Sequence, residues 1–284
     1  MPNLKELRNR ITSVSSTMQI TSAMKMVSAA KLKRSQDAIV QVRPYADKLG
    51  VLMANVSATL DSSENPYAIE RPLGRVLLIP VTANRGLCGA FNSSVLKRTK
   101  IVLDQFANEG VAVDVFALGK KGRDQLRKLD NLVGSDIEVV SKVSFDAARS
   151  LAQGVMNDFA SGKYDRVVVV YNQFKNAAIQ LVREEVVLPI PQPEGRPSSD
   201  YLYEPNKVEL LNSLIPTHIH MQFYKALLDS QASEQGARMT AMHKATDNAK
   251  SMRDGLKLDY NKARQAAITN EILEIVGGAE ALSS

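Results

Sequence analysis

Two glycine-containing turns are the segments of this chain in which phosphate-binding chemistry would be sought first. RGLCGAFN (85–92) follows an apolar run and precedes a helical pattern, which is where a phosphate loop would stand. A Walker loop needs a Lys directly after its second Gly, and a dinucleotide fingerprint needs three Gly at fixed spacing. Here Gly86 and Gly89 are three apart, and no Lys follows them. We therefore expect a tight strand-to-helix turn there, and an ordinary helix entry at LGKKGRD (118–124).

The histidines and the cysteine give no arrangement for metal binding or nucleophilic catalysis. His218 and His220 are two residues apart, which places them on different faces of a helix, and His243 is far along the chain. Cys88 has no His near it in sequence, so we expect a small buried side chain. As the only cysteine it excludes an internal disulfide and a Cys-based zinc site. The sequence predicts no catalytic residue, no cofactor and no metal.

Composition and charge narrow the class of protein further. The chain has 284 residues, 44% of them hydrophobic, and no apolar stretch near the roughly 20 residues of a membrane span. Its start, MPNLKELRNR, lacks the apolar core of a signal peptide, so we expect no presequence. The single cysteine favours a reducing compartment. Residues 1–48 hold nine basic and three acidic side chains, which equals the whole net charge of +6. Such a segment faces either solvent or an acidic partner, and nucleic acid is one such partner.

The two ends of the chain read as long helices. Residues 3–43 contain neither Gly nor Pro, and apolar residues recur at alternating spacings of three and four, as in a helix that lies along another helix. That series is Leu4, Leu7, Ile11, Val14 and Met18. The strict register then offers Thr21, Lys25 and Ser28, whereas the apolar residues move to Met24, Val27 and Ala30, which predicts a register slip. We expect the helix to be kinked or interrupted at Pro44 and to end near residue 60.

The C-terminal segment, 206–284, repeats this pattern. We expect one bend or break at Pro216. Beyond it the seam positions are Met239, Met242, Thr246, Ala249, Leu256, Tyr260, Ala263 and Ala267. We expect this helix to pair with residues 1–60. Because it is far longer than its own domain needs, part of its apolar seam requires a partner.

The middle of the chain alternates strands and helices, which is typical of an α/β layered domain at 70–190. We expect helices at 91–109, 119–129 and 144–162, with Ser144 as a cap and Gly162 as a stop. We expect strands at 75–83, 111–118, 137–143, 165–174 and 178–189, the last two as a hairpin. The predicted fold is of the α+β or α/β class. It combines a long antiparallel coiled coil of the N- and C-terminal helices with a central Rossmann-like α/β domain.

Several motifs closely resemble the γ subunit family of F-type ATP synthases. At the C-terminal end they are ARMTAMHKATDNA (237–249), YNKARQA (260–266) and ITNEILEIVGGAEAL (268–282). The N-terminal match is NRITSVSSTMQITSAMKMVSAAKLKRSQ (9–36), and the central ones are RGLCGAFN and YLYEP (201–205). The resemblance covers both ends almost continuously and the centre in patches.

The resemblance implies a non-catalytic rotor shaft. Such a shaft turns inside a ring of three α and three β subunits, and its lower part docks on the ε subunit and on the membrane c ring. Proton-driven rotation then forces the β sites through the states of ATP synthesis or hydrolysis. The implied location is the cytoplasmic face of the bacterial inner membrane, as a peripheral subunit without direct membrane insertion or nucleic-acid binding.

The resemblance also implies roles for six residues. Arg264 and Gln265 match a pair that contacts loops of the β subunit, and Thr269 and Glu271 match neighbouring polar positions linked to coupling. Met24 matches a position where a basic replacement impairs coupling, and Lys25 stands beside it.

Two alternatives belong to other classes. An α/β nucleotide-binding enzyme with helical dimerisation arms would show a ligand site at the carboxyl edge of the sheet. A basic coiled-coil nucleic-acid binder would leave the central domain without a purpose.

Overall fold

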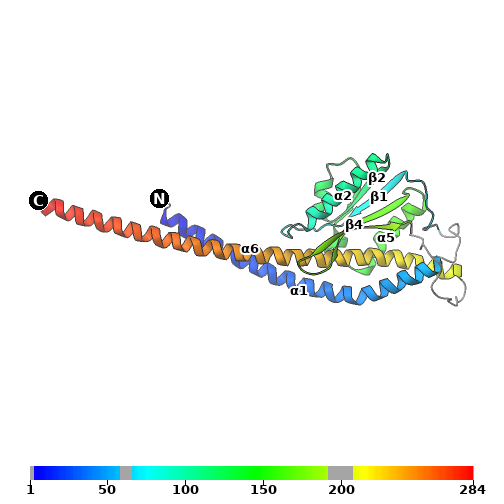
Figure 1. The fold of residues 1–284 in the computed structure, drawn as a ribbon, viewed down its shortest axis with the longest axis horizontal. Coiled ribbons are helices and arrows are strands. Elements are labelled where there is room, and N and C mark those ends of the chain that lie inside the picture. The colour runs from blue at the N-terminus through cyan, green and yellow to red at the C-terminus, as the bar shows by residue number, and fades with distance from the viewer. Residues whose placement is uncertain (1–2, 58–65, 191–206, 284) are drawn as a thin grey trace. The chain divides into compact units, whose positions relative to one another are not determined.

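The computed structural model describes residues 3–57, 66–190 and 207–283 (Figure 1). The helix end predicted near residue 60 and the YLYEP match lie outside these residues, as does most of PIPQPEGRPSSD (189–200), which its prolines mark as a linker. The elements are α1 (Leu4–Ser57), β1 (Arg75–Pro80), α2 (Phe91–Asn108), β2 (Ala112–Leu118), α3 (Lys120–Leu126), β3 (Leu132–Asp136), α4 (Glu138–Ser141), α5 (Phe145–Ala160), β4 (Arg166–Phe174), β5 (Gln180–Leu188) and α6 (Lys207–Ser283).

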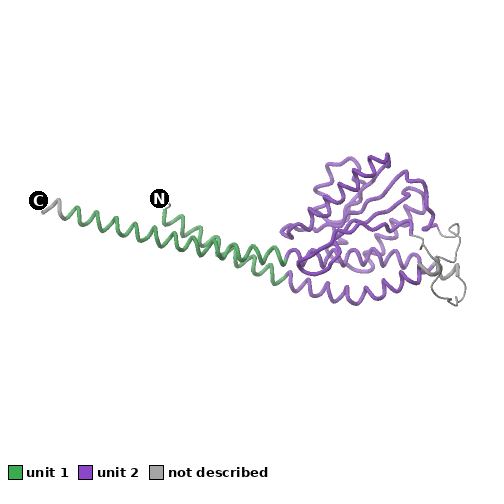
Figure 2. The backbone as a smooth tube through the Cα atoms, viewed as in Figure 1, with its two compact units in different colours: residues 1–27, 239–284 green, residues 28–238 purple. Residues whose placement is uncertain are grey.

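The chain divides into two compact units (Figure 2). Unit 1 comprises residues 1–27 and 239–284, and unit 2 comprises residues 28–238. Helices α1 and α6 contribute to both units. The predicted fold class is confirmed, because long helices at the two ends of the chain enclose a mixed α/β sheet in sequence.

The sheet of unit 2 has the strand order β3-β2-β1-β4-β5. Strand β1 is parallel to β2 and to β4, β2 is parallel to β3, and β4 is antiparallel to β5. The hairpin predicted at 165–189 is therefore present. The first four strands need crossover connections, which the helices between them provide.

The core of unit 2 lies on both faces of this sheet because its central strands are apolar on both sides. On β1, Val76 and Leu78 point to the face that α2 covers, and Leu77 and Ile79 point to the face that α5 and α6 cover. Phe159 of α5 is fully buried in the second layer. Figure 1 shows α2 and α5 against the central strands β1 and β4.

Side-chain caps fix the ends of two helices. The Ser144 hydroxyl accepts a hydrogen bond from Ala147 N at 3.2 Å, and Gly162, with φ 78°, follows α5, both as predicted. The strand predicted at 137–143 is wrong, because residues 138–141 form α4. Asp136 Oδ1 accepts hydrogen bonds from the backbone N–H groups of Glu138 and Val139, and this cap starts a helix where the β-branched composition favours a strand.

The two prolines do not end their helices. Pro44 lies inside α1 and Pro216 lies inside α6, and both helices continue through them. A proline removes one backbone hydrogen bond, but neighbouring packing can hold the chain in helical geometry. The predicted interruptions are therefore absent.

The register slip predicted in α1 is wrong at two of its three positions, since only Met24 is half-buried. Thr21 and Lys25 are half-buried and Ser28 is buried, so polar residues continue the strict register. Val27, which was expected to enter the seam, is 56% exposed, and Ala30 is exposed as well. Helix geometry and the partner helix decide which positions are covered, even where the covered side chains are polar.

Candidate functional site

Unit 1 is an antiparallel pair of helix segments. Besides a contact between Arg253 and Met18 described below, three side-chain contacts join α1 to α6 in this unit, and the two residue numbers of each add up to 267 or 268, close to the constant sum of an antiparallel pairing. The contacts are Arg8 Nη2 to the Tyr260 hydroxyl at 2.9 Å, the Thr21 hydroxyl to the Thr246 hydroxyl at 2.8 Å, and Lys25 Nζ to His243 Nδ1 at 3.4 Å.

Helix α6 continues past the part of it that α1 covers. Ala266 is the last half-buried residue, and every residue from 267 to 279 is exposed. The predicted seam position Ala267 is therefore wrong. The pairing rule explains this end point: by the same sums Leu4, the first residue of α1, lies opposite residue 263 or 264, so α1 does not extend along the residues that follow. The exposed segment is about 20 Å long at 1.5 Å per residue.

This exposed segment carries an apolar stripe. Ile268, Ile272, Ile275 and Val276 are 49%, 54%, 67% and 56% exposed. At about 100° per residue they fall within an arc of roughly 100°. The arc is rotated by roughly 120° from the residues that face α1, such as Leu256 and Tyr260. The stripe is therefore a face of its own and not an unused continuation of the α1 seam.

Four of the six predicted site residues flank this stripe. By the same helical geometry, Arg264 and Glu271 lie just outside one border of the stripe. At the other border, Gln265 lies just inside the stripe and Thr269 just outside it. All four are exposed. The Thr269 hydroxyl donates a hydrogen bond to the Gln265 carbonyl at 2.9 Å. Within the described residues Arg264 and Glu271 form no ion pair, so both charges are available to a partner.

Met24 and Lys25 lie apart from those four. Both are half-buried in the seam of unit 1, where Lys25 Nζ contacts His243. His243 and Arg264 are 21 positions apart on α6, or about 30 Å. The structure thus places the six predicted residues at two separate sites in unit 1.

The carboxyl edge of the sheet in unit 2, where an α/β enzyme would bind its ligand, is filled by the chain's own helix. Arg238 of α6 donates from Nη2 to the carbonyls of Arg85 and Gly86 at 3.3 and 3.4 Å. The Ser233 hydroxyl donates to the Asn172 carbonyl at 2.9 Å. The RGLCGAFN turn therefore binds a helix of its own chain at this edge.

The packing of α6 on the RGLCGAFN turn also buries the side chains around Cys88. Arg238 pairs with Glu234 at 2.6 Å, and their side chains are only 9% and 11% exposed. Ala237 packs in one cluster with Cys88 and Phe91. Burial raises the pKa of the Cys88 thiol, so Cys88 is the small buried side chain expected from the sequence and is kept protonated.

Comparison with known proteins gives the family. The ATP synthase family model matches residues 3–282. The ATP synthase gamma chain of Flavobacterium psychrophilum is 58% identical over 286 residues, which cover 99% of each chain. The gamma chain of Cytophaga hutchinsonii is 50% identical, and the match covers all of both chains. This chain belongs to the ATP synthase gamma chain family.

Solved structures agree with the family in fold. A chain from the central stalk and c-ring structure of the Tetrahymena thermophila mitochondrial ATP synthase is 28% identical, with a TM-score of 0.59, over 80% of this chain and 99% of that one. A chain from the Euglena gracilis mitochondrial ATP synthase in rotational state 3 has a TM-score of 0.70 at 23% identity, over 98% and 94%. The likeness in fold agrees with the family, and the enzyme alternative with dimerisation arms is not favoured.

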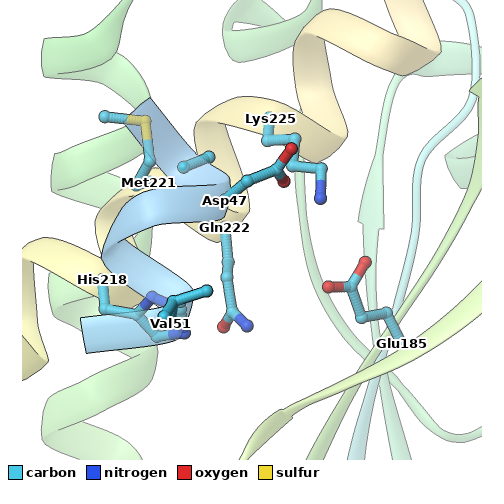
Figure 3. A pocket seen from close by; sticks show the side chains of 9 residues that line it. Asp47, Val51, Glu185, His218, Met221, Gln222 and Lys225 are labelled. Carbon is cyan, nitrogen blue, oxygen red and sulfur yellow. The ribbon is translucent and has the colours of Figure 1, made fainter. Parts of the chain in front are cut away.

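Unit 2 also has a pocket between α1, β5 and α6, lined by polar and apolar side chains (Figure 3). Its volume is about 370 Å³, and Asp47, Glu185 and Lys225 bring charges of both signs to it. Burial and the nearby Lys225 lower the pKa of His218, so this imidazole is neutral at pH 7. The described residues hold no group of three His, Cys, Asp or Glu side chains suited to a metal ion, and none of their helices has the length and apolarity of a membrane span.

Sequence reasoning missed one seam residue of the gamma chain. Arg253 lies in the α6 seam of unit 1, with Nη1 3.7 Å from Met18 Sδ. Its side chain is 21% exposed and also pairs with Asp254 at 2.8 Å. The sequence pattern pointed to this position, because alternating steps of four and three residues from Ala249 lead to residue 253 and then to Leu256. A charged residue was not expected at a buried position.

Proposed function

We propose that this chain is the central rotor shaft of a proton-driven F-type ATP synthase and that it has no catalytic site of its own. The observation that carries the proposal is the end of α6, where residues 267–279 are exposed and carry an apolar stripe. Four large apolar side chains on one exposed helix face need a surrounding protein. A shaft end enclosed by other subunits meets that need.

The proposed partners follow from the family. Segments 1–60 and 206–284 form the shaft, which turns inside a ring of three α and three β subunits. The domain at 70–190 docks on the ε subunit and on the membrane c ring. The chain works as a peripheral subunit at the cytoplasmic face of the bacterial inner membrane, neither inserting into the membrane nor binding nucleic acid.

Two sets of residues transmit the coupling in this proposal. Arg264 and Gln265 contact loops of the β subunits, with Thr269 and Glu271 beside them, and their exposure without ion pairs supports that role. Met24 and Lys25 act in the seam, where a further positive charge beside Lys25 would be repelled. The rotor needs contacts that break as it turns, and exposed ion pairs of about 0–1 kcal/mol each are suited to this.

The test removes the stripe without removing the helix. Ile268→Ser, Ile272→Ser and Ile275→Ser together replace three apolar side chains by polar ones on the proposed bearing face. We expect weaker co-purification with α and β subunits and a loss of ATP-driven proton pumping, measured in membrane vesicles. The matched control is Asn270→Ser with Glu274→Gln on the other face of the same turns, which should assemble and pump normally.

The isolated chain serves as a second control and should show no ATPase activity. The proposal fails if the triple variant assembles and pumps as the wild type does, or if the chain purifies without α and β subunits.

A further inference from the structure

A second apolar surface lies in unit 2, between α2 and the turn that follows α3. It is a groove of about 700 Å³ over β2, a volume in the range of small-molecule sites. Its apolar side chains are Leu96, Leu103, Val111, Val113, Leu126 and Leu129. We call it the α2–α3 groove.

The groove exists because α2 carries two apolar stripes. Val95, Val102 and Phe106 face the sheet and belong to its core. Leu96 and Leu103 stand one position further round the helix, face the groove and are only half-buried. Helix α3 spans 7 residues against the 18 of α2, so it is too short to cover the second stripe.

Two cations stand at one end of the groove. Lys97 and Lys100 line it from α2, and within the described residues neither forms an ion pair or a hydrogen bond. Arg98 between them is different, because it pairs with Glu184 at 2.7 Å and does not line the groove. The acidic lining residue, Asp104, stands further along α2. The groove therefore has a positive end, and its apolar lining runs on past Asp104 to Val111.

We propose that the α2–α3 groove binds an anionic amphiphile, with its acid group at Lys97 and Lys100 and its apolar chain along Leu103 towards Val111. From Lys97 to Ala107 the helix rises about 15 Å, which suits the extended chain of a medium-chain fatty acid. An apolar body and one acid group match an apolar floor and two lysines without partners. This inference is independent of the rotor function.

The experiment is a calorimetric titration of the full chain, in the assembly in which it is purified, with sodium dodecanoate below its micelle concentration. We expect one saturable site per chain. Decanoate should bind about sixteenfold more weakly, since it lacks two methylene groups and each contributes roughly fourfold. Dodecyltrimethylammonium, with the same chain and the opposite charge, should not bind at this site.

Two variants and a control locate the site. Lys97→Glu with Lys100→Glu should weaken dodecanoate binding at least tenfold at low salt, because two favourable charges become unfavourable. Ala107→Phe, at an exposed position of the lining, should block the chain without disturbing the core. Lys142→Glu with Lys175→Glu makes the same charge change at exposed lysines outside the groove and should leave binding unchanged.

Three outcomes would overturn the inference. They are the absence of saturable dodecanoate binding, equal binding of the cationic amphiphile, and an equal loss of affinity in the groove and control variants. Retained binding in Ala107→Phe would contradict the proposed position of the apolar chain.

Discussion

Unit 2 buries its apolar residues within itself, whereas the end of unit 1 displays them. In unit 2, β1 and β4 lie almost completely inside two apolar layers, and Phe159, Tyr164 and Phe223 have at most 1% of their surface exposed. In unit 1 the seam includes Thr21, Lys25 and Arg253, and the last turns of α6 expose five large apolar side chains, the four of the stripe and Leu273. One region has its stability in its own core, and in the proposed rotor the other is completed by neighbouring subunits.

The largest expected effect compares one side chain from each region. Phe159→Ala should lower the free energy of unfolding of unit 2 by about 3–5 kcal/mol, because it leaves a cavity in a fully buried layer. Ile272→Ala should change stability by less than about 0.5 kcal/mol, because Ile272 is 54% exposed. Denaturant unfolding of the full chain, with amide exchange in α5 and α6, measures both. Equal losses for the two variants would remove the distinction between the regions.

A smaller effect is expected from a buried ion pair of unit 2. Arg43 Nη2 lies 3.0 Å from Asp229 Oδ1, and the Asp229 side chain is fully buried. Arg43→Met leaves this carboxylate buried without its cation, at a cost of about 3 kcal/mol. Burial already raises the pKa of Asp229, and Arg43 opposes that rise, so the variant should titrate Asp229 at still higher pH.

The control for Arg43 is an exposed pair on the same helix. Lys33 and Asp37 are 2.8 Å apart with side chains 74% and 56% exposed, so Lys33→Met should cost no more than about 1 kcal/mol. Thermal unfolding of both variants gives the comparison. A loss for Arg43→Met as small as that for Lys33→Met would mean that Asp229 is not charged in the folded protein.

The smallest effect concerns the polar seam of unit 1. Thr21→Val with Thr246→Val replaces two hydroxyls 2.8 Å apart by methyl groups of the same shape. Removing both partners leaves no unpaired group, so we expect a change of about 0 to 1 kcal/mol towards stability. Slower amide exchange near residue 246 would measure it. A clear loss of stability would show that the polar seam positions hold the helices together.

The elements of unit 2 could be predicted because local signals and packing agree there. Ser144, Gly162 and the Val-rich run of β4 each mark a helix end or a strand, and the fold keeps them. Residues 137–143 could not be predicted, because the cap from Asp136 outweighs the β-branched composition of Val139 and Val140. In α1 the hydrophobic pattern alone gave a false slip, because the covered positions are set by the partner helix and not by hydrophobicity.

The candidate site also has features that the sequence predicts and features that only the structure shows. Family motifs supplied the six residues, and nothing in their spacing showed that Met24 and Lys25 are remote from the Arg264 group. The apolar stripe of Ile268, Ile272, Ile275 and Val276 is visible in the sequence as a helical repeat. Its exposure follows only from where α1 begins.

The seating of α6 at the carboxyl edge of the sheet has a mechanical consequence. Arg238 and Ser233 donate hydrogen bonds to backbone carbonyls of two different segments, and an ion pair with Glu234 holds the Arg238 side chain in place. A helix held at points on its circumference resists twisting about its own axis. Other α/β proteins keep this crevice open for a ligand, whereas here hydrogen bonds from α6 occupy it. These directional bonds resist rotation of the helix, which a purely apolar contact between helix and sheet would not do.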